Sequence, residues 1–389
     1  RPGLRGLRGP ACVGEVMRYV QINAYSGGWA DSVIFKKHRE LIAAGDESWV
    51  FWARGEHEQD DHMVKISSKF EVCLDALQTR LDGRAGFHSK RATRRLLRRL
   101  DAIDPDVVHL HVLCGYWVNI EMLFEWLAAH RCKVVWTLHD CWAFTGHCIY
   151  FTHAECDQWK RGCAFNAPCP QKGSYPETLF GGDKSVKWSY ERKKSLFTML
   201  PAERVQLIVP SQWLANLVGQ SFLSGYSVEV SRNAINTDIF KPMPSDFRKR
   251  YGLQDKFIVL GVASRWSERK GLSKFIRLAE ELDGSRFSVV LVGLSKKQIA
   301  KLDGKILALP RTNSLEELAK IYTAADILVN PSIEETFGMN VSEAAACGTG
   351  AVVMEGSACA EVADPALSVT SSPDLSQVVF AIEEIASRK

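Results

Sequence analysis

The chain has 389 residues and a net charge of +4, and these values already exclude several classes of protein. This length allows two domains of ordinary size, each with its own core. With 46% hydrophobic and 24% charged residues, the composition is that of a globular protein and not of a disordered one. The mild charge does not indicate a nucleic-acid binder. No apolar run reaches about eighteen residues, so the sequence predicts no membrane-spanning helix.

The start of the chain and its cysteines bear on the compartment. Residues 1–16 lack the apolar centre of a secretory signal, so we interpret them as a leader segment outside the fold, with a native start at Met17. The chain contains eleven cysteines. Without a signal peptide they favour reduced thiols in a cytoplasmic protein.

Residues 17–231 alternate short β-rich runs with segments of helical period. This alternation is typical of βαβ units that build a parallel sheet. We expect helices near 30–44 and 89–102, a helix between the strands at 107–112 and 133–140, a helix near 185–199 and a helix that begins near Gln212. A cysteine-rich insertion, 141–185, interrupts the pattern. The predicted strands lie within 18–24, 48–53, 107–112, 133–140 and 205–211.

A second alternating region follows a stretch rich in Pro, Asn and Asp at 231–246, which we interpret as a linker. The sequence therefore predicts an α/β protein of two doubly wound, Rossmann-like domains, 17–231 and 232–389, that face a central cleft. Ligands of such sheets bind beyond the carboxyl ends of the strands. The strands expected in the second domain lie within 256–264, 287–293, 305–310, 326–332 and 350–354.

Two glutamates flank a predicted helix start in the second domain. Glu335 falls in the loop after the strand at 326–332, and Glu343 falls in the helix that follows. Between them, the backbone amides of Gly338, Met339 and Asn340 form the first helical turn. Unpaired N–H groups and partial positive charge at a helix start attract an anion such as phosphate.

Two cations follow a neighbouring strand of the same domain. Arg265 and Lys270 lie in the loop after 256–264. Together with the helix amides they could hold a diphosphate, which leaves the two glutamates to bind hydroxyl groups. Taken singly, the glutamate spacing can arise by chance and the two cations can be ordinary surface charges. Their joint position at strand ends favours a functional site.

The same segments resemble the retaining glycosyltransferases of family 4, which have the GT-B fold. PSIEETFGMNVSEAAACGTGAVV is similar to that family's pair of glutamates separated by seven residues, and SRWSERKG is similar to its arginine and lysine loop. The resemblance implies that Glu343 binds the ribose hydroxyls and Glu335 the donor sugar, while Arg265 and Lys270 bind the diphosphate. The second domain would then bind the donor and the first the acceptor.

Two motifs of the first domain extend the resemblance. WTLHD places His139 where the family has a histidine that reaches the sugar near its anomeric carbon, although a histidine at a strand end can also be purely structural. SGGW, with Gly27 and Gly28, is similar to the family's glycine loop, but paired glycines often serve only a turn. LHDCWAFTGHCIYF, CPQKGSYP, VPSQWL and SFL resemble bacterial exopolysaccharide enzymes of the colanic-acid type.

The resemblance implies a retaining, metal-independent transfer of a sugar from a UDP- or GDP-linked donor to a glycan or lipid-linked acceptor, in bacterial cell-surface polysaccharide synthesis. No catalytic cofactor is expected. Two alternatives remain: a nucleotide-sugar epimerase of GT-B fold, and a nucleotide-sugar-binding protein without catalysis. The second is favoured by departures from the family pattern, since Gly350 stands where the family has proline and Ser357 and Ala358 stand where it has glycines.

The insertion and a basic helix raise two further hypotheses. Cys148, Cys156, Cys163 and Cys169 are candidate ligands of a structural zinc ion, although their spacing is not that of paired C-x-x-C motifs, and free thiols or disulfides are alternatives. The predicted helix at 89–102 could rest on anionic lipid at the inner face of the plasma membrane, or present a solvated surface. Its arginines are Arg91, Arg94, Arg95, Arg98 and Arg99.

Overall fold

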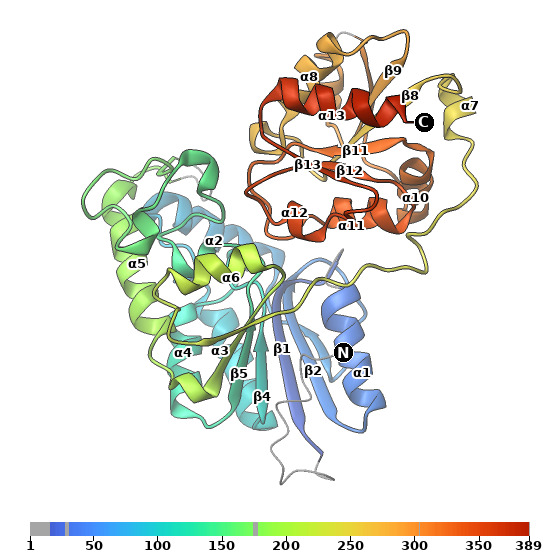
Figure 1. Cartoon of the computed structure of the whole chain (residues 1–389). Helices are drawn as coiled ribbons and strands as arrows, with labels where there is room; N and C mark the ends of the chain where they lie inside the picture. The colour runs from blue at the N-terminus through green and yellow to red at the C-terminus, as the bar shows by residue number, and fades with distance from the viewer. Residues whose placement is uncertain (1–15, 28–30, 174–177, 303, 389) are drawn as a thin grey trace. The chain divides into compact units, whose positions relative to one another are not determined.

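The computed structural model describes residues 16–27, 31–173, 178–302 and 304–388. The chain divides into two compact units, Arg1–Arg232 (unit 1) and Asn233–Lys389 (unit 2), one residue from the expected limit (Figure 1). Each unit has its own parallel sheet, so the predicted α/β class with two doubly wound domains is confirmed. Among the described residues, no helix is long and apolar enough to cross a bilayer.

Unit 1 contains a seven-stranded sheet in the order β3-β2-β1-β4-β5-β6-β7, with every pair parallel. Five of these strands match predicted runs. The two short edge strands, β3 and β7, were not predicted. The strands are β1 (Arg18–Tyr25), β2 (Glu47–Arg54), β3 (Met63–Lys65), β4 (Val107–Leu110), β5 (Lys133–Thr137), β6 (Val205–Val209) and β7 (Ser227–Val230).

Helices cover both faces of this sheet. Helices α3, α4 and α5 pack side by side on one face, and α1 lies on the other (Figure 1). Of the helices of unit 1 given below, the sequence predicted all except α2. The helix expected near 30–44 begins with a short π-helix, η2. The helices are η2 (Asp31–Phe35), α1 (Lys36–Ala43), α2 (Lys69–Asp82), α3 (Lys90–Ile103), α4 (Ile120–Ala129), α5 (Gly182–Phe197) and α6 (Gln212–Gly219).

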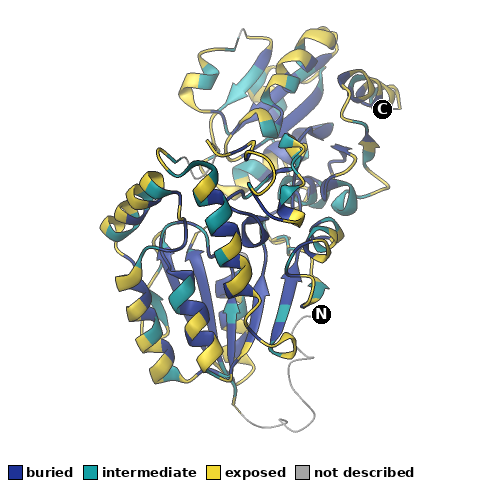
Figure 2. Ribbon diagram, turned by 90° about the vertical axis from the view of Figure 1, so that its left-hand side faces the viewer, coloured by how far each residue is buried: buried dark blue, intermediate teal, exposed yellow. Residues whose placement is uncertain are grey.

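The central strands are buried on both faces, as expected for a parallel sheet covered by helices. In β1, Val20 and Ile22 face the larger core, while Tyr19 belongs to a smaller cluster with Leu41 of α1. Figure 2 shows this as buried strands beneath helices that expose only their outer faces. The strand ends are therefore the places where polar side chains can serve a site.

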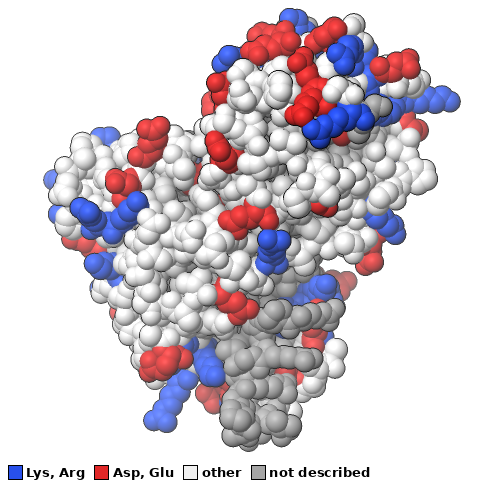
Figure 3. Space-filling model, in the orientation of Figure 1, with Lys and Arg blue, Asp and Glu red and all other residues white. Residues whose placement is uncertain are grey.

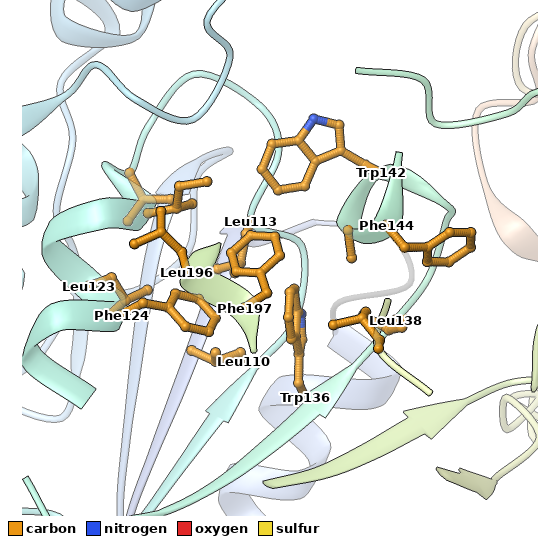
Figure 4. Close-up of a cluster of buried hydrophobic side chains, with 14 of the residues drawn as sticks. Leu110, Leu113, Leu123, Phe124, Trp136, Leu138, Trp142, Phe144, Leu196 and Phe197 are labelled. Carbon is orange, nitrogen blue, oxygen red and sulfur yellow. The ribbon is translucent and has the colours of Figure 1, made fainter. Parts of the chain in front are cut away.

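The insertion 141–185 is anchored by aromatic side chains. It begins in a 3₁₀ helix, η3 (Trp142–Phe144), whose Trp142 and Phe144 are buried and border the cluster around Trp136 and Phe197 (Figure 4). Farther along, the ring of Trp159 lies 5.4 Å from that of Phe144. Its other short helices before α5 are η4 (Thr152–Ala154) and η5 (Gln158–Lys160).

Unit 2 contains a six-stranded parallel sheet in the order β10-β9-β8-β11-β12-β13. Five strands match predicted runs, and the edge strand β13 was not predicted. The strands are β8 (Phe257–Val262), β9 (Phe287–Val292), β10 (Ile306–Leu309), β11 (Ile327–Asn330), β12 (Ala351–Met354) and β13 (Val369–Ser371).

The helices of unit 2 form two cores. Helices α7, α10 and α11 contribute to one core, and α8 and α13 to the core on the opposite face. The first strand of this sheet, β8, lies near its centre. The chain adds β9 and β10 on one side of β8 and then β11, β12 and β13 on the other, which places a topological switch point between β8 and β11. The helices are α7 (Phe247–Tyr251), η7 (Glu268–Lys270), α8 (Leu272–Glu281), α9 (Lys296–Ile299), α10 (Leu315–Ala324), α11 (Met339–Ala346), α12 (Cys359–Val362) and α13 (Leu375–Ser387).

Unit 1 has the matching switch point between β1 and β4. In open α/β sheets, the loops that leave such a point diverge and open a crevice in which ligands bind. The loops after β8 and β11, and those after β1 and β4, are therefore the first places to look for a site.

Candidate active site

The loops after β8 and β11 meet closely at the switch point of unit 2. Gly271 has a φ of +77°, and a Cβ there would lie 2.5 Å from Cγ of Pro331, so this close approach requires glycine. Nearby, Nη1 of Arg269 donates a hydrogen bond to the carbonyl of Glu334 over 2.7 Å. These contacts fix the two predicted loops against each other.

Lys270 and Glu335 form an ion pair across these loops. The ammonium group comes from the end of η7 and the carboxylate from the loop before α11. The Glu335 residue is only 8% exposed, so its charge is stabilised mainly by this partner. The structure thus brings together two residues that the sequence analysis had selected from segments 65 positions apart.

Gly338 begins α11 in a conformation that few other residues can adopt. Its φ is +94°, and a Cβ there would lie 2.6 Å from Sγ of Cys359. The first N–H groups of an α-helix have no intrahelical acceptor, so the amides of Gly338, Met339 and Asn340 are suited to bind an anion. This helix start directly follows the loop that carries Glu335.

The side chain of Asn340 holds the helix start in place. Its Nδ2 donates to the carbonyl of Val262 at the end of β8, and its Oδ1 accepts from Nδ2 of Asn330 at the end of β11, both over 3.0 Å. Any contribution of Asn340 to donor binding therefore comes from its backbone amide. The side chain joins the two strand ends at the switch point.

Glu343 lies one turn farther along α11 and accepts a hydrogen bond from the hydroxyl of Tyr322 over 2.9 Å. Burial raises the pKa of Glu343 to about 7, and the hydrogen bond from Tyr322 opposes this shift. Tyr322 is fully buried in the core of unit 2. Nothing in the sequence around Tyr322 marked it as a partner, because it comes from a different helix, α10.

Arg265 is exposed and has no ion-pair partner among the described residues. The loop around it is anchored by its neighbour Trp266, whose indole N–H donates to the carbonyl of Val292 over 2.9 Å. Gln298 in turn donates to the carbonyl of Trp266 over 3.2 Å. The arginine thus projects from a fixed loop and remains available to a ligand.

One departure from the family pattern has a steric cause. A Cβ at Gly350 would lie 1.8 Å from the carbonyl oxygen of Leu367, so the approach of this segment to the start of β12 allows only glycine. Ser357 donates its hydroxyl hydrogen bond to the carbonyl of Met354 over 3.2 Å, and the amide of Ala358 donates to the carbonyl of Glu335 over 3.3 Å. The substituted segment therefore still supports the Glu335 loop.

Stacked imidazoles occupy the strand ends near the switch point of unit 1. Nδ1 of His111, just after β4, lies 3.4 Å from Nε2 of His139, just after β5. The ring of His109 lies 4.1 Å from that of His111. Burial lowers the pKa of His139 to about 4 and that of His109 to about 3. These imidazoles are therefore neutral at physiological pH.

Asp140, which follows His139, and Lys193 both bind the backbone of Trp142, and neither was predicted. Burial raises the pKa of Asp140, which accepts a hydrogen bond from the amide of Trp142 over 2.8 Å. Nζ of Lys193, buried on α5, donates to the carbonyl of Trp142 over 2.6 Å, and burial lowers its pKa to about 7. Asp140 could have been suspected from its place after a strand. Lys193 has no such signal.

A small cavity lies at this position. Its volume is about 20 Å³, close to that of one water molecule, and its lining includes His111, His139, Asp140 and Trp142. The Nε2 atom of His111 is buried without a hydrogen-bond partner among the described residues. The cluster can thus offer neutral hydrogen-bonding groups to a polar ligand.

The predicted glycine loop after β1 is only partly described. The amide of Ser26 donates to the carbonyl of Arg54 over 2.9 Å, and a Cβ at Gly27 would meet open space. Nothing in the local packing therefore requires glycine at position 27. Gly28 lies outside the described residues.

The structure assembles the cysteines of the insertion differently from the expected set. Cys148 and Cys169 come together with His147 in one buried group, and Cys156 and Cys163 are not members of that group. His147 was not among the predicted ligands.

The predicted basic helix is confirmed as α3, and its arginines are exposed. Arg95 also contacts α2: its Nη2 donates to the carbonyl of Ile66 and pairs with the carboxylate of Glu71, both over 2.7 Å. On the face shown in Figure 3, acidic and basic side chains of the described residues are interspersed.

Two family models together match most of the chain. A family model described as Glycosyltransferase Family 4 matches residues 30–239, and one described as Glycosyl transferases group 1 matches residues 245–387. The chain belongs to glycosyltransferase family 4. Its two parallel sheets have the GT-B architecture, and sucrose-phosphate synthase from Thermosynechococcus elongatus matches 95% of this chain and 90% of its own with a TM-score of 0.65 at 15% identity.

The chain is also similar to curated bacterial proteins. It is 27% identical over 242 residues to the putative colanic acid biosynthesis glycosyl transferase WcaC of Escherichia coli K12, a match that covers 57% of each chain. It is 36% identical over 129 residues to an alpha-galactosylglucosyldiacylglycerol synthase of Streptococcus pneumoniae, covering 30% of this chain and 34% of that protein. The chain thus matches 57% or less of the length of these two relatives.

A structure of HepE from Anabaena in complex with UDP-glucose matches 96% of this chain and 90% of its own, with a TM-score of 0.60 and 14% identity. At this level of identity the likeness concerns the fold alone.

Proposed function

We propose that this protein is a retaining glycosyltransferase that moves a sugar from a nucleotide diphosphate sugar to a glycan or lipid-linked acceptor in bacterial cell-surface polysaccharide synthesis. The observation that carries the proposal is the Lys270–Glu335 pair beside the start of α11, at the switch point of the unit that the glycosyl transferases group 1 model matches. Unit 2 would bind the donor and unit 1 the acceptor, at the cytoplasmic side of the membrane.

The proposed mechanism follows from the charge that develops in the reaction. Breaking the bond between sugar and diphosphate leaves an oxocarbenium-like sugar and builds negative charge on the phosphate oxygens. Lys270, Arg265 and the amides at the start of α11 stabilise that charge without a metal ion. The departing phosphate takes the proton of the acceptor hydroxyl, which attacks the same face of the sugar, so the anomeric configuration is retained.

The donor and acceptor groups are proposed from the two switch points. Glu343 accepts hydrogen bonds from the ribose hydroxyls and Glu335 from the donor sugar, while His139 contacts the sugar near its anomeric carbon. UDP or GDP is the proposed carrier, and the UDP-glucose complex of HepE supports the former. The similarity to WcaC and to a glycolipid synthase supports a polysaccharide or lipid-linked acceptor.

Donor binding is the first test of the proposal. Thermal-shift measurements with UDP, GDP and their sugars should show stabilisation by one nucleotide and its sugar. Arg265→Ala should weaken that stabilisation. Arg277→Ala should not, because Arg277 is another exposed arginine of unit 2, on α8, that pairs with Glu281. No stabilisation by any nucleotide would contradict the proposal.

Product analysis then separates the three candidate activities. With the selected donor and a lipid-linked acceptor, NMR of the product should show the anomeric configuration of the donor. Interconversion of the donor without acceptor would identify an epimerase. Nucleotide binding without turnover on any acceptor would identify a binding protein.

We also propose that unit 1 rests on an anionic membrane surface, through α2 together with the basic helix α3. Four apolar side chains of α2 are exposed at helical spacing, and Phe70 is 74% exposed. Arg95 of α3 pairs with Glu71 of α2, which places the arginine-rich helix beside this stripe. An apolar stripe next to basic side chains is typical of helices that lie in a bilayer interface. The stripe consists of Phe70, Leu74, Leu77 and Leu81.

Flotation with vesicles that contain anionic lipid tests this surface. Phe70→Ser with Leu77→Ser should release the protein from the vesicles, and Arg94→Glu with Arg98→Glu should do the same at low salt. Phe380→Ser is the matched control, because Phe380 is 63% exposed on α13 of unit 2. Protein that stays in solution with every vesicle at low salt would contradict the membrane proposal.

A further inference from the structure

Three potential metal ligands converge inside the cysteine-rich insertion. One nitrogen of His147 and the sulfurs of Cys148 and Cys169 all lie within 4.8 Å of one another, and all three residues are buried. Nε2 of His147 is 3.5 Å from Sγ of Cys169. The active-site chemistry proposed above uses none of these groups.

This arrangement matches the dimensions of a zinc site. Zinc binds cysteine sulfur at about 2.3 Å and histidine nitrogen at about 2.0–2.1 Å in a tetrahedron, which separates these two ligand atoms by about 3.5 Å. The observed distance between His147 and Cys169 is the same. Soft thiolates combined with an imidazole select zinc over hard cations such as Mg²⁺.

A fourth ligand is available next to His147. The sulfur of Cys163 accepts a hydrogen bond from the amide of Gly146 over 3.2 Å, and a Cβ at Gly146 would lie 3.0 Å from Cβ of Cys163. Cys163 is buried, whereas Cys156 is partly exposed. Its burial and its contact with the residue before His147 therefore favour Cys163 over Cys156 as the fourth ligand.

We propose that His147, Cys148, Cys163 and Cys169 bind a structural zinc ion. This set replaces Cys156 of the four-cysteine expectation with His147. The site is closed, as structural zinc sites are, because four protein ligands leave no position for substrate. Its role is to hold the insertion together, and it does not depend on the glycosyl transfer proposed for the switch points.

The surroundings of the cluster also suit a metal site. Nε2 of the buried Gln171 lies 3.6 Å from the sulfur of Cys148 and donates to the carbonyl of Tyr150 over 2.9 Å. The amide of Cys169 donates to the carboxylate of Asp183 over 2.7 Å, at the start of α5. Such outer contacts orient ligands around a metal.

A zinc ion bound to these ligands would link the beginning of the insertion to its end. Cys148 follows the anchored 3₁₀ helix η3, and Cys169 precedes α5. Between them, the described regular structure consists of the two short 3₁₀ helices η4 and η5. Metal bonds therefore supply order that this segment's local structure provides only in part.

Metal analysis of the purified full chain tests the proposal. Protein prepared under reducing conditions without added metal should contain about one zinc ion per chain. Cys148→Ser and Cys169→Ser should each lower the zinc content roughly tenfold or more. Cys156→Ser and Cys73→Ser are the controls and should retain zinc. Full retention of zinc in Cys169→Ser, or no zinc in the wild-type protein, would overturn the site.

Cobalt substitution identifies the ligand set. The wild-type protein loaded with Co²⁺ should show the intense visible absorption of a tetrahedral site, together with sulfur-to-cobalt charge-transfer bands from three thiolates. Cys163→Ser should reduce those bands by about one third. An unchanged spectrum in Cys163→Ser, with loss in Cys156→Ser, would overturn the assignment of the fourth ligand.

A measurement on the wild-type chain covers the case in which variants fail to fold. Alkylation followed by mass spectrometry should show Cys148, Cys163 and Cys169 protected until a chelator is added, while Cys73 reacts at once. Chelator-independent labelling would contradict the proposal. A Cys148–Cys169 disulfide in freshly prepared protein would do so as well.

Discussion

The two switch points share one topology and differ in charge. In unit 2, the strand ends hold an ammonium–carboxylate pair, Lys270 with Glu335, beside a helix start. In unit 1, the equivalent position holds stacked imidazoles whose pKa values burial lowers, so they are neutral at physiological pH. The same topology therefore carries a charged pair at the strand ends of one unit and neutral polar groups at the strand ends of the other.

Under the proposed function, this difference in charge separates donor binding from acceptor binding. An anionic diphosphate needs cations and amide dipoles that are oriented before it arrives. A sugar or glycan acceptor presents hydroxyl groups, which neutral imidazoles can contact without the desolvation cost of a buried charge. Substitutions in both units can test this contrast in charge.

Lys270→Met should have the largest effect. Without the ammonium group, charge on the departing diphosphate is poorly stabilised, and kcat should fall by roughly 10²–10³-fold. The variant should also lose about 3 kcal/mol of stability, because Glu335 is left buried without its partner. Steady-state kinetics and urea denaturation measure the two effects separately.

The double variant Lys270→Met with Glu335→Gln distinguishes catalysis from structure. Stability should recover, because no unpaired charge remains, but activity should not. If the double variant recovers full activity, the pair is structural and the charge contrast between the units has no catalytic meaning.

Gly338→Ala should destabilise unit 2 by about 2–4 kcal/mol, since it combines a positive φ with a steric clash against Cys359. Gly356→Ala is the matched control: its φ is +77°, but a Cβ there meets open space, so its loss should be smaller. In unit 1, Gly27→Ala should change stability by only about 0.5 kcal/mol or less. Urea denaturation checks all three, and equal losses for Gly338 and Gly356 would remove the steric argument.

His139→Ala should lower kcat by roughly tenfold to a hundredfold while leaving the Kd for the donor nucleotide unchanged. The reason is that the imidazole lies in unit 1, whereas the nucleotide contacts are proposed in unit 2. Calorimetric titration and kinetics measure the two quantities, with the exposed His62→Ala as control. A weakened nucleotide affinity in His139→Ala would contradict the proposal that unit 2 alone binds the nucleotide.

The sequence predicted most of the fold, because central strands such as β8 and β12 are continuous apolar runs that only a covered parallel sheet can bury. The edge strands β3, β7 and β13 escaped prediction. They have only three or four residues each, and they form strands because they pair with a neighbouring strand more than because of their own composition.

The residues of the candidate site were likewise predictable only in part. Lys270 and Glu335 could be found because each lies in the segment between a predicted strand and the helix that follows it. Tyr322 could not be found, since it reaches Glu343 from a buried position on α10. Lys193 and His147 likewise acquire their partners only through tertiary packing. Sequence spacing therefore finds groups placed by strand ends and misses groups brought in by packed helices.

The smallest expected effect concerns Glu343 and the pH dependence of stability. Burial raises its pKa from 4.5 to about 7 in the folded protein. A group with a raised folded pKa contributes stability that is present at low pH and is lost as the pH rises toward that value. The wild-type protein should therefore lose about 1–2 kcal/mol between pH 4.5 and pH 7 through this group, less than the full shift implies because the side chain is partly exposed.

Glu343→Gln should remove this pH-dependent loss, because glutamine does not titrate, and it should weaken nucleotide binding if the carboxylate holds the ribose. Tyr322→Phe provides the complementary change. It deletes the hydrogen bond that favours the ionised carboxylate, so the loss should shift to higher pH. Urea denaturation across this pH range measures both variants. A Glu343→Gln protein with the wild-type pH profile would show that another group titrates there, and the charge assigned to the unit 2 switch point would then rest on Lys270 and Glu335 alone.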